Sequence, residues 1–548
     1  MLRAALASLA SICVGCSFFT PFPDVELQGG GGSSSGGGGA GAEGGGPACD
    51  VETECSNCPS EMCPAPDDPI ELSVDASALA ENPDSALTII DGLVAEDILF
   101  IGTFRQAVTL TVPGRSGVTG LTTQTGFIFR PFNADVITPV TNCGSDDQPF
   151  SSGEVFFTSM SDAGDQYVVA GAFEGDYLRF SDTSQPMCGT GGSIVSAPAG
   201  NGEKFAPFIA FARDNNTGIE GALTAINAAR GNENGYISDV AALDSSQHRV
   251  VAVGMAKQDP FAQSSDFDGS TALYYVLAAD GPSLDDMVVL NRRICSANDF
   301  DQGVLGGLRS SITVDGDGVV WVAGTGCEPD DSDGDHSFIE RIPTLGLTTF
   351  DEKSSIDLGT DEAPVGVTKI SANDARVFVA GTYSGEPFAE TPGAETGTDD
   401  GFVMAFERDS WDQGAAWVTR IASTGKPEIG ALLSAGDKVF VTGTIVGDGG
   451  ISPSLACFTS DEPTKGRAFL AALDAATGDL QWLRFDGFDA GSPTENAFAR
   501  GTALAAGGAD VFSAMSIHGQ LEMSCGGATT NPSNRPEAWI RPYLGIVR

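Results

Sequence analysis

Seven short apolar runs recur along this 548-residue chain, and six of them end in glycine. They read ILFIG, YVVAG, VVAVG, VWVAG, VFVAG, VFVTG and VFSAM, and they end at Gly102, Gly171, Gly254, Gly324, Gly381, Gly443 and Met515. Successive runs are separated by 57 to 83 residues. A repeat of this length indicates one supersecondary unit used seven times.

Each unit contains more than its apolar run. After the fifth and sixth runs, Gly401–Ile421 and Ala468–Phe485 both read as a strand, a polar turn and a second strand. A shorter strand and turn precede each run, as in Ala431–Thr444. The pattern therefore predicts four strands per unit, which we call a, b (the apolar run), c and d.

The b runs are apolar on both faces and do not alternate with polar residues. A strand of this kind is buried on both faces, so its sheet must be packed between two layers. Four-stranded antiparallel blades arranged around a common axis meet that condition without helices. The sequence therefore predicts an all-β fold, a seven-bladed β-propeller spanning residues 67–548, in which the glycine ends strand b where backbones crowd near the hub.

The two ends of the repeat region complement each other. The last unit, ending in Glu537–Arg548, has a c strand but little room for a d strand. The segment Ile70–Val74 precedes the first a strand and has no local partner. We expect this N-terminal strand to complete the last blade and to close the ring, because closure removes the open sheet edges.

The units resemble the repeats of a bacterial seven-bladed β-propeller family. The resemblance rests on Val377–Gly381, Phe402–Phe406 and Trp417 in one unit, and on Val439–Gly443, Phe469–Asp474, Gly478 and Trp482 in the next. It covers the repeats and excludes the cysteine-rich segment before them. It implies a secreted or lipid-anchored protein of the bacterial envelope.

The stretch Ala472–Trp482 also resembles the repeat of propellers that bind pyrroloquinoline quinone. That resemblance implies that the Trp and the Gly of the motif hold neighbouring blades together. The several well-kept copies and the adjacent cysteine pair of those enzymes are missing from this sequence. We therefore expect no quinone cofactor.

The first sixteen residues have the character of a secretion signal. Arg3 precedes an apolar stretch, Ala4–Val14, that is too short to span a bilayer. The following residues up to Cys16 resemble the lipobox of bacterial lipoproteins, with Cys13 in the place where Leu is usual. The resemblance implies a signal peptide over residues 1–16, lipidation of Cys16 and, because Ser17 follows, sorting to the cell outer membrane. The alternative is an ordinary signal peptide.

Two further segments precede the repeats. Residues 17–48 are predicted to be a disordered linker, because the Gly/Ser-rich part, Gly29–Ala48, buries nothing and has a reach of roughly 25 Å. Residues 49–66 are rich in cysteine. Two disulfides are the favoured outcome outside the cytoplasm, zinc is the alternative, and the pairing stays open among Cys49, Cys55, Cys58 and Cys63.

Six cysteines lie within the repeats. Cys143 follows the d strand of unit one, and Cys188 lies in the b–c loop of unit two. Because Cys295 and Cys327 occupy the same two places in units three and four, we predict the pairs Cys143–Cys188 and Cys295–Cys327, each joining adjacent blades. The b–c loops of the last two units leave a third pair, Cys457–Cys525.

Few residues suggest catalysis or metal binding. Asp331, Asp333 and Asp335 alternate as in a calcium loop but lack its glycine and its bidentate glutamate, so a solvated acidic loop is the alternative to weak calcium binding. The stretch Val314–Trp321 reads as an a–b hairpin turn. The three histidines fall in different units, and no serine lies in a GxSxG motif.

The net charge of −46 limits the partners. Such a surface repels phosphate backbones, so we expect no nucleic-acid partner and membrane contact only through the lipid. We expect a monomeric, non-enzymatic binding or scaffold module, without a cofactor other than weakly bound calcium, whose partner is an envelope protein or a glycan. The alternatives are a carboxylate-based glycan hydrolase or lyase, and a purely structural surface component.

Overall fold

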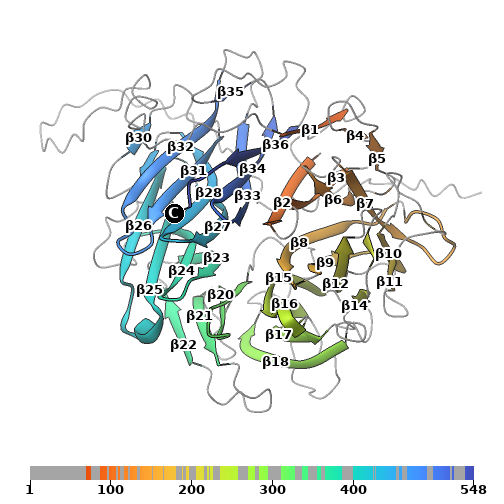
Figure 1. Ribbon diagram of the computed structural model, residues 1–548, viewed down its shortest axis with the longest axis horizontal. Helices are drawn as coiled ribbons and strands as arrows, with labels where there is room; N and C mark the ends of the chain where they lie inside the picture. The colour runs from red at the N-terminus through yellow and green to blue at the C-terminus, as the bar shows by residue number, and fades with distance from the viewer. Residues whose placement is uncertain are drawn as a thin grey trace, which may run out of the picture.

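The computed structural model of the chain is an all-β assembly of sheets arranged around a common centre (Figure 1). The structure describes residues 70–75, 87–94, 98–105, 109–111, 117–120, 122, 124–131, 136–150, 152–164, 166–180, 188, 193–196, 205–214, 219–220, 223–225, 235–247, 249–256, 270–277, 283–293, 310–326, 336–343, 354–359, 365–385, 399–423, 425, 427–447, 449–451, 456–458, 466–489, 498–518, 521–523 and 537–547.

The described strands form seven antiparallel sheets, numbered here in chain order of their innermost strands. Sheet 1 consists of β2 (Leu87–Val94), β3 (Ile98–Arg105), β6 (Gln124–Arg130), β7 (Val136–Cys143), β10 (Tyr177–Phe180) and β11 (Ser193–Ser196). Sheet 2 consists of β8 (Val155–Asp162), β9 (Tyr167–Phe173), β12 (Ala206–Asp214), β13 (Ile219–Glu220) and β14 (Leu223–Ala225).

Sheets 3 and 4 have four strands each. Sheet 3 consists of β15 (Gly235–Asp244), β16 (Arg249–Ala256), β17 (Ser270–Leu277) and β18 (Ser283–Arg293), with the short 3₁₀ helix η3 (Ser245–Gln247) in its first turn. Sheet 4 consists of β19 (Ser310–Val314), β20 (Val320–Gly326), β21 (His336–Ile342) and β22 (Ser354–Leu358). The turn between β19 and β20 is the hairpin predicted at Val314–Trp321.

Three larger sheets complete the ring. Sheet 5 consists of β23 (Val365–Ala372), β24 (Arg376–Tyr383), β25 (Asp400–Glu407), β26 (Trp417–Ser423), β29 (Gly449–Ile451) and β30 (Ala456–Phe458), with η4 (Arg408–Gln413) between β25 and β26. Sheet 6 consists of β27 (Glu428–Ala435), β28 (Lys438–Val446), β31 (Gly466–Asp474), β32 (Leu480–Asp489) and β35 (Leu521–Met523). Sheet 7 consists of β33 (Phe498–Gly507), β34 (Asp510–His518), β36 (Glu537–Tyr543), β1 (Ile70–Asp75), β4 (Thr109–Thr111) and β5 (Val118–Thr119).

A hydrophobic core lies at every junction between consecutive sheets, and this is why the b runs are apolar on both faces. In β16, Val250 and Ala252 pack into the core shared with sheet 2, whereas Val251 and Val253 pack into the core shared with sheet 4. The innermost strands contact one another in a closed cycle of β2, β8, β15, β19, β23, β27 and β33. The predicted burial of the b strands between two layers is confirmed.

The glycine of the b run has a different role from the one predicted. Strand β24 does not end at Gly381 but continues through Tyr383. A Cβ at Gly381 would lie 1.9 Å from the carbonyl oxygen of Gly366, next to a β-bulge in the inner strand between Val367 and Lys369. Gly171 lies equally close to the inner strand of sheet 2, 1.8 Å from the Phe156 carbonyl oxygen. Glycine therefore permits strands a and b to approach at the bulge.

The N-terminal strand closes the ring as predicted. Strand β1 pairs antiparallel with β36, with Ile70 opposite Ile540 and Ser73 opposite Glu537. It thereby supplies the fourth strand of sheet 7, which the C-terminal segment lacks. Leu72 is buried in the core between sheets 7 and 1.

The segments that connect strands b and c, which we call b–c insertions, cross between sheets. In sheets 1, 2, 6 and 7 they add strands to the outer edge of the preceding sheet: β4 pairs with β1, β10 with β7, β29 with β26, and β35 with β32. The prediction of uniform four-stranded blades is therefore wrong for the sheets that receive these strands, sheets 1, 5, 6 and 7, because an outer d strand is an open edge that the next insertion covers.

The predicted β-propeller is confirmed, but its number of blades is not. Six blades, mostly of four or five strands, are recognised in the ring, whereas hydrogen bonding divides the described strands into seven sheets. The insertions that cross between neighbouring sheets make the units irregular, with between four and six strands in each sheet.

Candidate functional site

Carboxylates join the inner strands of neighbouring sheets near the centre of the ring. The Oδ2 atom of Asp91 on β2 accepts a hydrogen bond of 2.8 Å from the N–H of Met160 on β8. Asp239 on β15 occupies the same place two junctions on, and its Oδ2 accepts from the N–H of Ile312 at 2.9 Å and the hydroxyl of Ser311 at 2.6 Å. Each aspartate follows a β-bulge in its strand.

At three other junctions a serine hydroxyl, and not a carboxylate, accepts the hydrogen bond from the neighbouring inner strand. The hydroxyl oxygens of Ser161, Ser311 and Ser371 accept hydrogen bonds from the N–H groups of Ala242, Ile370 and Ser434. Five consecutive junctions, from sheet 1 to sheet 6, are thus bridged by a side-chain oxygen of one inner strand and an N–H of the next. Because an innermost strand is a sheet edge, these contacts satisfy donors that its own sheet leaves unpaired.

Asp91 is half-buried in this arrangement. Burial raises its pKa to about 6, the neighbouring Lys369 opposes the rise, and Asp239 adds to it. Asp91 also accepts a hydrogen bond from the N–H of Gly92, which favours the charged form. The Asp91 carboxylate accepts from the backbone donors of Gly92 and Met160, so its evident role is structural.

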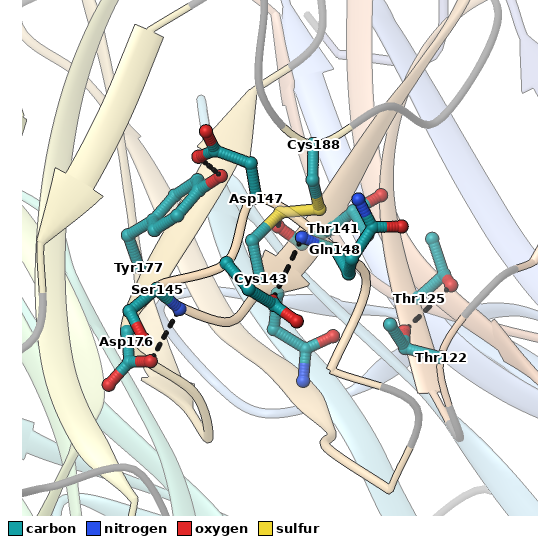
Figure 2. The surroundings of a disulfide bond; sticks show 12 residues. Thr122, Thr125, Thr141, Cys143, Ser145, Asp147, Gln148, Asp176, Tyr177 and Cys188 are labelled. Atoms are coloured by element: carbon teal, nitrogen blue, oxygen red, sulfur yellow. Dashed lines mark hydrogen bonds between the residues drawn. A yellow bond between two sulfur atoms is a disulfide. The ribbon is translucent and has the colours of Figure 1, made fainter.

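The b–c insertion of sheet 2 is joined covalently to sheet 1. A disulfide joins Cys143, the last residue of β7, to Cys188 in the b–c insertion of sheet 2, as predicted (Figure 2). Their Cα atoms lie 5.9 Å apart. The same insertion pairs β10 with β7, placing Tyr177 opposite Cys143. The disulfide therefore fixes one sheet to the next.

An acidic loop, Ser145–Gln148, lies beside this disulfide. The Ser145 N–H donates to the carboxylate of Asp176 at 2.6 Å, and the hydroxyl of Tyr177 donates to Asp147 at 2.9 Å (Figure 2). Asp147 adopts a positive φ of 60°. These bonds make the loop a structural turn.

Two glutamates and an arginine meet at the same end of this junction. Glu154 immediately precedes β8, Glu174 immediately follows β9, and Arg105 is the last residue of β3. The Glu174 N–H donates to the Glu154 carbonyl oxygen at 3.0 Å. Burial and, to a smaller extent, the charge of Glu174 raise the pKa of Glu154 to about 8, against the opposing effect of Arg105. Glu154 therefore holds its proton at neutral pH.

A tryptophan and a glycine hold sheets 5 and 6 together, in line with the resemblance to quinone-binding propellers. A Cβ at Gly478 would lie 2.5 Å from Cε3 of Trp417. The Trp417 indole N–H donates to the Ala475 carbonyl at 3.2 Å, and the Thr419 hydroxyl donates to the Gly478 carbonyl at 2.8 Å. The motif is a structural contact between blades.

Most other predicted site residues lie outside the described part of the chain. These are Cys16, Cys49, Cys55, Cys58, Cys63, Cys295, Cys327, Cys525 and the calcium candidates Asp331, Asp333 and Asp335. Cys457 belongs to β30, but its side chain is not described. Within the described ranges, no group of three or more His, Cys, Asp or Glu side chains could hold a metal ion. No helix among these residues is long and apolar enough to cross a membrane.

Glu154 and Asp91 were not identified from the sequence. A signal for Asp91 exists in the a strands, where Ile89 and Ile237 each stand two residues before an aspartate. Glu154 has no such signal, because its environment is made by Glu174 and Arg105, which lie in other strands.

The comparisons with known proteins concern the fold. No protein family matches the sequence, and no curated protein is similar to it. Structural likeness extends to an ulvan lyase of polysaccharide lyase family PL25 (10% identity, 83% of this chain and 91% of that chain, TM-score 0.39). It extends also to a quinohemoprotein alcohol dehydrogenase from Comamonas testosteroni (10% identity, 85% and 77%, TM-score 0.34) and to BamB from Moraxella catarrhalis (12% identity, 63% and 96%, TM-score 0.25). No activity of this chain follows from these likenesses.

Proposed function

We propose that this protein is a lipid-anchored module of the bacterial outer membrane whose propeller binds a partner and has no enzymatic activity. In this proposal Cys16 carries the lipid, residues 17–48 are the tether, and the ring holds the binding surface away from the membrane. The binding function is inferred from the propeller alone, and the lipid anchor is inferred from the N-terminal sequence.

We infer that the ring has seven blades, one for each hydrogen-bonded sheet. Two observations support this number. A hydrophobic core occupies each of the seven junctions, and the seven innermost strands contact one another in a closed cycle. A unit that shares a core with both neighbours behaves as a blade even where insertions enlarge it.

The observation that carries the binding function is the exchange of b–c insertions between neighbouring sheets. Four of them pair with the preceding sheet, and one is fixed by the disulfide between Cys143 and Cys188. The surface formed by the b–c insertions is therefore built from segments of adjacent sheets that are held in fixed positions. A preorganised surface of this kind loses little conformational entropy when a partner binds.

The experiment is a pull-down from envelope extracts with the full-length protein at low and high salt. At a net charge of −46, partners with positive charge or shared divalent ions are favoured. We expect such binding to weaken as salt rises through about 0.15 M, because exposed charges become screened. Retention of no partner at any salt concentration, over several extracts, would contradict the proposal.

A specific observation favours the second candidate, a carboxylate-based glycan hydrolase or lyase. Burial and the charge of Glu174 raise the pKa of Glu154 to about 8, and acid–base cleavage of a glycoside needs a carboxylic acid that keeps its proton at neutral pH. A screen for glycan turnover, run beside the pull-down, separates the two functions. Glycan turnover that Glu154→Gln abolishes would show that the protein is an enzyme and would replace the proposed binding function.

A further inference from the structure

The outer edges of the sheets accept added strands. The short strands β4, β10, β29 and β35, of three or four residues each, pair antiparallel with the fourth strand of the preceding sheet. Among the described residues sheet 4 receives no such strand, and β22 is its outermost one, at the rim of the ring (Figure 1). The outer side of an edge strand carries backbone N–H and C=O groups that a further strand can pair with.

The insertion that would reach this edge by the same rule is the b–c insertion of sheet 5, residues 386–398. It reads EPFAETPGAETGT, with two prolines, two glycines and three glutamates. Proline cannot donate to a strand ladder, and the segment has no run of β-branched or aromatic residues. The sequence therefore predicts no strand in this insertion, and it leaves the edge of β22 to a strand from another molecule.

The two faces of β22 define which side chains an added strand should carry. Side chains alternate between the faces of a strand. Leu358 is buried in the core between sheets 4 and 5, and Ile356, on the same face, is partly exposed and packs against that core. Ser355 and Asp357, on the other face, are exposed. An added strand with apolar residues on the first face would extend the core, and its polar residues on the second face would stay in water.

The edge is also acidic. The sequence around β22 contains five acidic residues and one basic one, namely Asp351, Glu352, Asp357, Asp361 and Glu362 against Lys353. A second copy of the chain would bring the same edge and a net charge of −46, so pairing between copies is disfavoured. Lys or Arg opposite Asp357 is favoured, because opposite charges in a cross-strand pair attract each other.

We propose that the outer edge of β22 binds an extended, basic segment of a partner protein as an added antiparallel strand, in which apolar residues alternate with Lys or Arg. The inference rests on the proposed binding function and names the kind of partner. In this mode of recognition the main-chain hydrogen bonds supply affinity, and the side chains at alternate positions supply specificity.

The probe is an octapeptide of alternating lysine and valine with blocked ends, added to the full-length protein at a salt concentration of about 0.05 M, where charges are weakly screened. Calorimetry measures its affinity, and hydrogen exchange read by mass spectrometry locates it. Exchange in Ser354–Leu358 should become slower, because the outward N–H groups of β22 then enter a ladder. An octapeptide of alternating glutamate and valine should not bind.

Asp357→Lys should lower the affinity of the basic octapeptide about fivefold or more, because like charges then face each other across the ladder. Asp412→Lys is the matched control. It makes the same change of charge at an exposed residue of η4, which is not a sheet edge, and it should bind the octapeptide like the wild type. Circular dichroism verifies that both variants fold.

Several results would overturn the inference. Absence of binding is one, and binding without slower exchange in Ser354–Leu358 is another, since it would indicate attraction by charge alone. Slow exchange of these residues before the octapeptide is added would mean that the edge is already occupied, by a second copy if sedimentation shows a dimer and by the chain itself if it shows a monomer. If the pull-down still retains a partner, the proposed binding function survives each of these results.

Discussion

The carboxylate of Asp91 accepts a hydrogen bond of 2.8 Å from the backbone N–H of Met160, which belongs to the inner strand of the next sheet. The inner strand of a propeller blade is an edge without a partner strand, so its N–H groups need other acceptors. Asp91 supplies one of these acceptors. Burial of its charged form costs free energy, and the pKa of the carboxylate is accordingly raised to about 6.

Replacement of Asp91 by asparagine should remove a pH dependence of stability. The pKa of Asp91 in the folded state is raised from its usual value of 3.8 to about 6, so between about pH 4 and 6 the folded state binds more protons than the unfolded state. The free energy of unfolding of the wild type, relative to Asp91→Asn, should therefore fall by about 1–3 kcal/mol as pH rises through this range, and then level off. Urea unfolding at several pH values measures this difference.

The matched control is Ser161→Ala, which removes the acceptor of the next junction without removing a titrating group. It should cost about 1–3 kcal/mol, because the half-buried N–H of Ala242 loses its partner. Its cost should not change between pH 4 and 6. A pH profile of Asp91→Asn that parallels the wild type would mean that Asp91 titrates normally.

Gly478→Ala should weaken the contact between sheets 5 and 6. Gly478 has a φ of 75°, and an added Cβ would lie 2.5 Å from the indole of Trp417. Gly508 has a similar φ of 62° but no atom within 4 Å of the added Cβ. We expect Gly508→Ala to cost about 1 kcal/mol from the backbone alone, and Gly478→Ala to cost about 2–4 kcal/mol. Chemical denaturation gives both values, and equal costs would show that the contact with Trp417 contributes nothing.

Loss of the disulfide between Cys143 and Cys188 should lower stability. The two residues are 45 positions apart, and closing a loop of that length in the unfolded chain corresponds to about 4 kcal/mol in the chain-entropy account. The double variant Cys143→Ser/Cys188→Ser should unfold at a correspondingly lower denaturant concentration. The reduced wild type should unfold at the same concentration as this variant. Recovery of Cys143 as a free thiol in unreduced protein would refute the pairing.

The pairs Cys295–Cys327 and Cys457–Cys525 remain predictions. Cys295 follows β18 by two residues and Cys327 comes directly after β20, so their places in the chain correspond to those of Cys143 and Cys188. Peptide mapping without reduction should recover both pairs. A crossed pairing, such as Cys327 with Cys457, would show that position within the unit does not determine the partner.

The sequence predicted the parts of the fold that depend on local pattern. Strand b, the hairpin turns and the closing strand Ile70–Val74 were all readable, because burial on both faces and a missing partner leave a visible mark. The motif Ala472–Trp482 predicted a contact between a tryptophan and a glycine of neighbouring blades, but the tryptophan that meets Gly478 is Trp417 of the preceding unit. The true role of Gly381 did not, because the bulge that crowds it lies in another strand, around Thr368.

The exchange of insertions and the candidate site could not be predicted in this way. Strands β4, β10, β29 and β35 are short, and each pairs with a sheet other than its own. The raised pKa of Glu154 arises from Glu174 and Arg105 together with burial, and all three causes depend on the assembled ring. Sequence reasoning finds such residues only after the junctions between sheets are known.

The last prediction concerns the lipid anchor. If Cys16 is acylated, Cys16→Ser should move the protein from the membrane fraction to the periplasm or the medium, because Gly29–Ala48 and the acidic propeller give it no other means of staying at a membrane. Cys13→Ser is the control, since it lies in the same segment but does not carry the lipid, and it should stay in the membrane fraction. Fractionation with metabolic labelling by a fatty acid measures both. A Cys16→Ser protein that stays with the membrane would show that the lipoprotein interpretation is wrong.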